Sequence, residues 1–201
     1  PNMATTFDLF LLGTAPQIDT VEGNITSENH QALEGLVFGS TSDPLAANVA
    51  SLSPDVDLLL FPDYRSGSTS DAYDTNNFLS NEQFVIGGVR YTHDATMLYS
   101  NTVITYTDGT TATVSAMVMQ DTAGNLYLLP PPSGPTAYSD ALEAKPILSV
   151  TLGTATPANG TEVYAMTADR YGLTLSDYVV EGTTGNDLID TNYAGDPEGD
   201  R

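Results

Sequence analysis

Hydrophobic and polar residues alternate along much of this chain, and short polar turns interrupt the alternation. The clearest stretch is residues 111–119, where alanine and valine fill the even positions and mostly polar residues the odd ones. A period of two is that of a strand with one buried face. Asp108-Gly109 separates this stretch from the apolar residues 103–106, and an Asp-Gly between two such runs predicts a two-residue hairpin turn. Residues 101–130 are therefore predicted to form a three-stranded antiparallel meander that ends with a strand at 126–129.

The same pattern, rich in threonine, valine and tyrosine, predicts strands elsewhere in the chain. These strands cover residues 6–12, 36–38, 56–61, 83–89, 95–99, 147–152 and 162–166. Helix is scarce: residues 139–144 are predicted to form one or two turns, and residues 28–33 are a weaker candidate. Residues 65–77 lack periodicity, which predicts a long surface loop. Many short strands joined by turns favour a mainly-β fold, an antiparallel β-sandwich of the jelly-roll type with few short helices.

The character of the chain changes near residue 180. Residues 181–201 contain six acidic residues and one arginine, and few apolar residues that could enter a core. We therefore place the β-sandwich domain at residues 4–179. Residues 180–201 are expected to be either the start of a calcium-binding repeat in a β-roll or a solvated acidic linker.

The charge balance excludes several classes of partner. The chain has 26 Asp and Glu against 5 Lys and Arg, a formal net charge of −21. Such a field repels nucleic acid and anionic membrane surfaces, and no apolar run is long enough to span a bilayer. Bound cations would relieve the self-repulsion, although the charge could also serve solubility alone. The absence of cysteine excludes disulfides, thiolate nucleophiles and cysteine-ligated metals.

The acidic tail contains one calcium-type motif. Residues 182–190, Gly-Thr-Thr-Gly-Asn-Asp-Leu-Ile-Asp, fit the nonapeptide G-G-x-G-x-D-x-U-x with threonine in place of the second glycine. Its glycines let backbone carbonyls turn towards a cation, and its aspartate adds a carboxylate. Calcium takes six to eight oxygen ligands, so one nonapeptide is half a site that nearby acids would complete. The predicted ligands of Ca²⁺ are Gly185, Asn186, Asp187, Asp190, Asp196, Glu198 and Asp200.

Residues 180–190, followed by Gly-Asp-Pro-Glu-Gly-Asp-Arg at 195–201, resemble the start of repeats-in-toxin (hemolysin-type) calcium-binding arrays. They look most like the arrays of large secreted bacterial proteins that end in a Hint domain. Residues 74–77, 105–113 and 120–128 are similar to the N-terminal region of the same proteins. The resemblance implies type I secretion, calcium, and an extracellular or cell-surface location. It supplies no activity for this region, and the Hint chemistry would lie outside these residues.

Other groups of polar residues are weaker signals. Residues 71–77 hold two carboxylates and two amides, a composition that favours Asx turns over a calcium loop. Asp55, Asp57 and Asp63 flank a hydrophobic strand and are expected to be solvated strand ends rather than ligands. His30 and His93 are the two histidines, and the sequence contains no G-x-S-x-G, P-loop, dinucleotide or H-E-x-x-H motif. We therefore assign no catalytic residue and expect no enzyme, although a paired-carboxylate glycosidase stays open.

Three functions follow from these patterns. The first is a non-enzymatic extracellular module of a secreted calcium-binding protein, with a structural or adhesive role. The second is a carbohydrate-binding module or glycan-active enzyme whose exposed tyrosines stack on sugars, although tyrosines packed on a sheet are the commoner reading. The candidate tyrosines are Tyr64, Tyr73, Tyr91, Tyr99 and Tyr138. The third is a subunit that assembles with copies of itself through exposed sheet edges.

Overall fold

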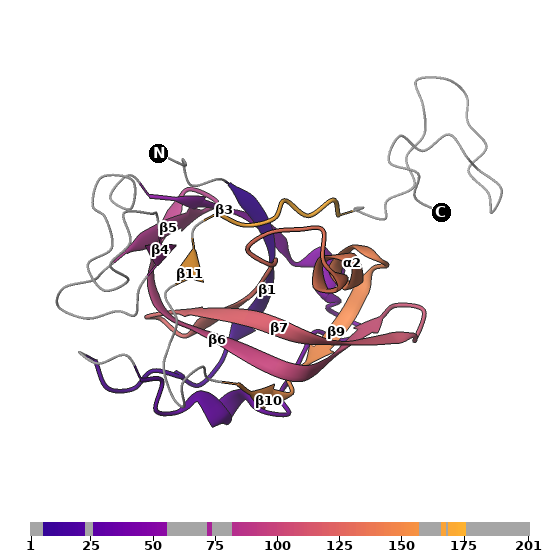
Figure 1. The fold of residues 1–201 in the computed structure, drawn as a ribbon, viewed down its shortest axis with the longest axis horizontal. Helices are drawn as coiled ribbons and strands as arrows, with labels where there is room; N and C mark the ends of the chain where they lie inside the picture. Colours follow the sequence, from indigo (N-terminus) through magenta and orange to yellow (C-terminus); the bar gives the residue numbers. More distant parts are fainter. Residues whose placement is uncertain are drawn as a thin grey trace, which may run out of the picture.

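A computed structural model describes residues 6–22, 26–55, 72–73, 82–156, 166–167 and 169–175. Most of its elements belong to one antiparallel sheet (Figure 1). The strands are β1 (Phe7–Thr14), β2 (Val37–Phe38), β3 (Val49–Pro54), β4 (Ala72–Tyr73), β5 (Gln83–Ile86), β6 (Val89–Tyr106), β7 (Thr111–Asp121), β8 (Asn125–Leu129), β9 (Ile147–Thr151), β10 (Thr154–Ala155) and β11 (Met166–Thr167). The helices are the 3-10 helices η1 (His30–Leu33) and η2 (Leu45–Ala47) and the α-helix α2 (Ala137–Glu143).

Six strands of this sheet close into a ring. Strands β6, β5, β3, β1, β8 and β7 pair in that order, and β7 pairs back to β6. The predicted mainly-β, antiparallel class with few short helices is confirmed, and strands on opposite sides of the ring face each other across a shared core, as the layers of a sandwich do. Among the described strands of this sheet, only the two-residue strands β2 and β10 have a single neighbour. Such short edges offer few unpaired backbone groups to a second chain.

Alternation along the ring strands sorts apolar side chains into two cores. The side chains that point into the ring, together with Tyr73 of β4, form an inner core of Phe7, Leu9, Leu52, Tyr73, Phe84, Met119, Tyr127 and Leu129. The opposite face of the same strands, with Phe10 and Leu128 among others, packs under η1, η2 and α2 as a larger outer core. Burying both faces explains why β8 is buried along almost its whole length, which a strand with one wet face would not be.

The predicted meander is confirmed, with a wider turn at its tip. Strands β6, β7 and β8 pair in succession, and the even positions of β7 are more buried than the odd ones over residues 111–118. The Tyr106 amide donates to the Thr110 carbonyl oxygen, so three residues, not the predicted two, form the turn. Gly109 has a φ of 81°, a left-handed conformation that closes a three-residue hairpin loop.

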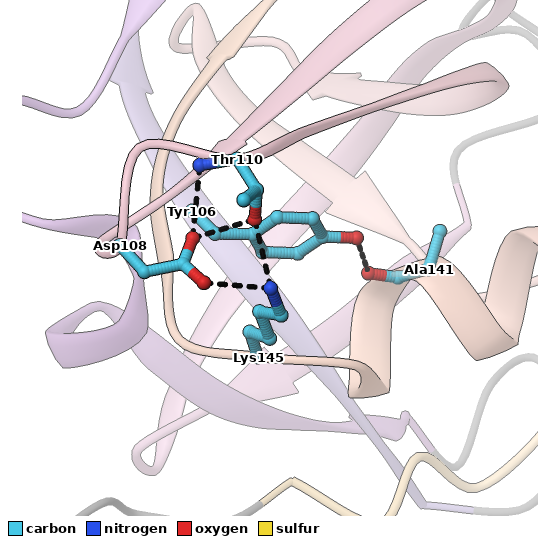
Figure 2. A network of polar contacts seen from close by, with 5 residues as sticks. All are labelled: Tyr106, Asp108, Thr110, Ala141 and Lys145. Atoms are coloured by element: carbon cyan, nitrogen blue, oxygen red, sulfur yellow. Dashed lines mark hydrogen bonds and ion pairs between the residues drawn. The ribbon is translucent and has the colours of Figure 1, made fainter.

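Polar contacts fasten this hairpin tip to the end of α2 (Figure 2). The Lys145 ammonium donates to Asp108 Oδ2 at 2.6 Å and to Thr110 Oγ1 at 2.9 Å, and it lies 5.8 Å from the centre of the Tyr106 ring. The Tyr106 hydroxyl donates to the Ala141 carbonyl oxygen at 2.7 Å. These contacts hold α2 across the outer core.

The remaining element predictions have mixed outcomes. The strands predicted at 6–12, 36–38 and 147–152 are confirmed as β1, β2 and β9, and the short helix at 139–144 as α2. Residues 28–33 contain η1 rather than an α-helix. The strand β3 was not predicted, and the strands predicted at 83–89 and 95–99 are in fact β5 and one long β6 separated by a turn at 87–88. The strand predicted at 56–61, most of the loop predicted at 65–77 and most of the strand predicted at 162–166 lie outside the described residues. Within the predicted loop, residues 72–73 form the strand β4 instead. Within the described residues, no helix is both long and apolar enough to cross a bilayer.

Candidate metal centre

A bulge in β6 sets the direction of the Asp94 side chain. His93 pairs with Asp121 of β7, yet Ala95 pairs with Gln120, so one residue of β6 is extra at this point. An extra residue reverses the inward and outward positions of the strand that follows it. Accordingly, Tyr91 packs on the inner core before the bulge, while Ala95 packs in the outer core after it. Asp94 is the extra residue, and its carboxylate lies with acids of the segment that runs outside the ring.

That outer segment, residues 15–22, leaves β1 and lies on the outer face of the sheet. Ile18 is fully buried in the outer core, and its amide donates to the side chain of Gln120 on β7 at 2.9 Å. Asp19 follows directly, almost completely buried, and its Oδ1 accepts from the Val21 amide. The Val21 amide also donates to the Glu28 carboxylate, which turns the chain so that Glu22 returns to the sheet.

Asp19, Glu22 and Asp94 bring three carboxylates together. One oxygen from each side chain lies within 4.8 Å of the others. Asp94 is 0% exposed and Asp19 is 2% exposed, whereas Glu22 is exposed to solvent. Neither carboxylate oxygen of Asp94 accepts a hydrogen bond from any residue that the structure describes. We call this cluster of two buried acids and one exposed acid the acidic recess.

The electrostatics of the recess favour a positive charge. Burial, followed by repulsion from Glu22, Asp19 and Asp121, raises the pKa of Asp94 from 3.8 to about 7. Partial burial and the nearby Glu28 carboxylate raise the pKa of Glu22. The charged form of such a carboxyl group is high in free energy, so a cation or a proton that neutralises it stabilises the folded chain.

Hard oxygen donors at this spacing suit a hard divalent cation. Calcium binds oxygens at 2.3–2.6 Å, so two ligands on opposite sides of the ion are about 5 Å apart, and the three oxygens fit within that span. Three carboxylates supply between three and six oxygens, and water could complete the sphere on the exposed side of Glu22. The donor set contains no sulfur or imidazole, which the softer transition metals prefer.

The calcium ligands predicted from the sequence belong to a part of the chain that the structure does not describe. Gly185, Asn186, Asp187, Asp190, Asp196, Glu198 and Asp200 all lie outside the described residues, as does most of the 71–77 stretch. The prediction that Asp55 is solvated is wrong: it is buried and forms an ion pair with Arg90, with Oδ2 and Nε 2.9 Å apart. The exposed Arg90 side chain, on β6 across β5 from β3, brings a cation to the end of β3.

His93 lies apart from the acidic recess. It is fully buried, its Nε2 is 2.8 Å from Thr96 Oγ1, and its ring is 5.7 Å from that of Tyr73 in the inner core. Asp94 and His93 are thus on different faces, as neighbouring strand residues usually are.

The candidate sugar-binding tyrosines differ in their exposure to solvent. Tyr73 and Tyr99 are fully buried, Tyr91 and Tyr138 are partly exposed, and Tyr64 lies outside the described residues. Tyr91 lines a half-open hollow of about 210 Å³ at one mouth of the ring. The other lining residues are Leu11, Gly13, Ile86, Asn125, Leu126 and Tyr127. The hollow combines two aromatic rings, aliphatic groups and one amide, and no carboxylate from the described residues lines it.

Sequence reasoning missed the acidic recess because its members are far apart in the chain. One local signal was available: Asp94 directly precedes the apolar run 95–99, where a buried acid needs a partner. The spacing of Asp19 and Glu22 in a polar stretch looks like any solvated turn. Only the β6–β7 bulge and the docking of residues 15–22 bring the three together.

Comparisons with known proteins add no relative. The chain matches no protein-family model, and neither a curated protein nor a solved structure is significantly similar to it.

Proposed function

We propose that this chain is a non-enzymatic extracellular module that binds calcium and uses the ion to fix an outer segment against its sheet. The observation that carries the proposal is Asp94, whose carboxylate is fully buried, accepts no hydrogen bond from the described residues, and faces two further acids. Leaving such a charge unpaired costs several kcal/mol. At neutral pH a bound cation removes this cost without protonating the site.

Calcium suits the recess better than the other common hard cation. Magnesium demands near-ideal octahedral geometry at about 2.0–2.1 Å and keeps most of its water, whereas calcium accepts irregular oxygen cages. The recess is irregular, since two of its acids come from one outer segment and the third from a bulge in β6. The net charge of −21 adds a long-range attraction for divalent cations.

The role of the ion in this proposal is structural. It would link residues 19–22 to β6, one of the two strands whose pairing closes the ring. A ligand present at 100 times its Kd stabilises the folded state by about 2.7 kcal/mol. Extracellular calcium-binding modules have Kd values of about 10⁻⁴–10⁻³ M, the range expected for this site. The resemblance of residues 180–201 to a calcium-binding repeat supports the same setting and adds a separate, second site.

Isothermal titration with calcium, after removal of metal by a chelator, tests the proposal. The wild-type chain is compared with Asp94→Asn, which keeps the size of the side chain and removes its charge. Asp140→Asn on the exposed face of α2 is the matched control, since it removes one charge far from the recess. An Asp187→Asn/Asp190→Asn double variant distinguishes calcium binding by residues 180–201 from calcium binding by the recess.

The expected result is calcium binding at the recess that survives in the control and in the tail variant but is lost in Asp94→Asn, which keeps only the binding to the tail. Magnesium at the same concentration should bind at least about tenfold more weakly. Equal calcium binding by Asp94→Asn and the wild type would refute the recess as the site, and loss of all binding in the tail variant would move the site to residues 180–201.

Carbohydrate binding is the second candidate function, and the hollow at the mouth of the ring favours it. Tyr91 stacks on Phe84 with ring centres 5.7 Å apart, and Tyr127 lies edge-on to both, so the aromatic wall is rigid. Mouths of closed sheets are common ligand sites, and a rigid aromatic wall beside an amide suits the apolar face and hydroxyl groups of one sugar ring. Asn125 supplies that amide.

Titration of methyl glycosides, followed by ¹H–¹⁵N NMR, tests this second candidate. Binding should shift the amide signals of Tyr91 and Asn125 and should disappear in Tyr91→Ala. Tyr138→Ala, which removes a partly exposed tyrosine away from the hollow, should leave the shifts unchanged. Shifts confined to other residues, or none from any common pyranoside at 50 mM, a concentration of about ten times a weak Kd of several mM, would exclude the hollow as a sugar site.

A further inference from the structure

Gln120 lies at the junction between the outer segment and the ring. Its side chain is fully buried on β7, and every polar atom of its amide has a backbone partner in the outer segment or the adjoining turn. Its Oε1 accepts from the Ile18 amide at 2.9 Å. Its Nε2 donates to three carbonyl oxygens, those of Ala15 at 3.3 Å, Pro16 at 3.2 Å and Gly124 at 3.3 Å.

This one side chain also connects the two halves of the acidic recess. Ile18, which it holds, directly precedes Asp19. In the β6–β7 register, Gln120 is opposite Ala95, the residue after Asp94. Gln120 therefore fixes the outer segment at the same point of the sheet where the bulge presents its carboxylate.

We infer that Gln120 is the positioning residue of the calcium site: it contacts no ion, but it holds Asp19 at the distance from Asp94 that a shared cation requires. This inference rests on the calcium-binding function proposed above. Without an ion, the carboxylates repel each other and push the outer segment away from the sheet. The hydrogen bonds of Gln120 oppose that push, so the recess is preformed before calcium arrives.

Few other side chains could replace it. A glutamine offers an acceptor and two donors on one planar group, and this site uses both kinds. Methionine has the same length but satisfies none of these backbone groups, and asparagine has the right chemistry but is one methylene too short. Residues that orient metal ligands typically change metal affinity by 10–100-fold when they are substituted.

Calcium titration of Gln120→Met, Gln120→Asn and the wild type tests the inference. The control is Leu52→Ala in the inner core, which destabilises the fold without touching the outer segment. We expect the calcium Kd to rise at least about tenfold in both Gln120 variants and to remain within about twofold of wild type in the control. All titrations are made well below the melting temperature of each variant, so that a loss of stability alone does not change the Kd.

A second measurement, made on the wild type alone, tests the inference even if the Gln120 variants do not fold. Saturating calcium should slow hydrogen exchange of the Ile18 amide, which donates to Gln120, at least about tenfold more than that of the Leu9 amide on β1. An unchanged Ile18 exchange rate, or wild-type Kd values in folded Gln120 variants, would overturn the inference. If the wild type itself binds no calcium, the proposed function fails first, and the two failures are thereby distinguished.

Discussion

Substituting Asp94 by asparagine should change stability in opposite directions with and without calcium. The amide has nearly the same shape as the carboxylate, and its NH₂ group can donate to the neighbouring carboxylates of Asp19 and Glu22. In calcium-free solution, the variant replaces a carboxylate that its acidic neighbours repel by an amide that can donate hydrogen bonds to them. In calcium, it removes a ligand from the ion.

The size of the calcium-free effect follows from the pKa of Asp94. Burial and the neighbouring acids raise this pKa from 3.8 to about 7. A rise of about 3 in pKa corresponds to about 4 kcal/mol of cost for the charged form in the folded state. Because Glu22 is exposed and water reaches that side of the recess, we reduce this to about 2 kcal/mol. For a chain of this length, that is an increase of about 4–8 °C in melting temperature.

Thermal unfolding followed by circular dichroism at pH 8 measures both effects. With a chelator present, Asp94→Asn should melt about 4–8 °C above the wild type. With calcium at 100 times its Kd, the wild type should gain about 2.7 kcal/mol and the variant almost nothing, which reverses or removes the difference. A calcium-free variant that melts below the wild type would refute the reasoning, because it would mean that the Asp94 carboxylate is stabilised where it lies.

Three further predictions concern pH, the hairpin tip and backbone packing. In calcium-free buffer, the wild type should lose stability relative to Asp94→Asn as the pH rises from about 4 to about 7. A carboxyl group whose pKa is raised in the folded state favours folding while it is protonated, and this contribution is lost as the pH rises through the pKa of the folded state. Denaturant titrations at each pH would contradict this if the difference in stability between the two proteins stayed constant. Lys145→Met should raise the pKa of Asp108 from about 2 towards 3.8, since the lysine donates a hydrogen bond to that carboxylate; a ¹³C NMR titration that still gives about 2 would contradict it. Gly153→Ala should destabilise the fold by roughly 2–3 kcal/mol, because its Cβ would lie 1.9 Å from a backbone oxygen of β6, while Gly172→Ala, with no atom within 4 Å, should melt within about 2 °C of wild type.

The sequence predicted the parts of the fold that depend on local pattern. The β6–β7–β8 meander follows from alternation and two turns, and α2 from a short polar stretch before a proline. The ring could not be predicted, because its closure depends on β6 pairing with strands on both sides over a length of 18 residues. The bulge at Asp94 reverses the alternation of inward and outward side chains within β6. In the sequence, this one strand therefore looks like two separate strands.

The acidic recess was beyond sequence reasoning for a related reason. Asp19 and Glu22 look like surface residues, and their approach to Asp94 depends on Gln120 and Ile18, which belong to different elements. The tail motif, by contrast, was visible at once because all its predicted ligands are close in sequence. A pattern of this kind identifies local ion-binding loops and overlooks sites that tertiary contacts assemble.

A crystal structure of the chain grown in millimolar calcium would show whether Asp19, Glu22 and Asp94 share a calcium ion. We expect one ion with oxygens of Asp19, Glu22 and Asp94 at about 2.3–2.6 Å, and an anomalous signal that identifies it as calcium. The same three carboxylates without an ion between them, and with Asp94 bonded to a protein donor instead, would contradict it.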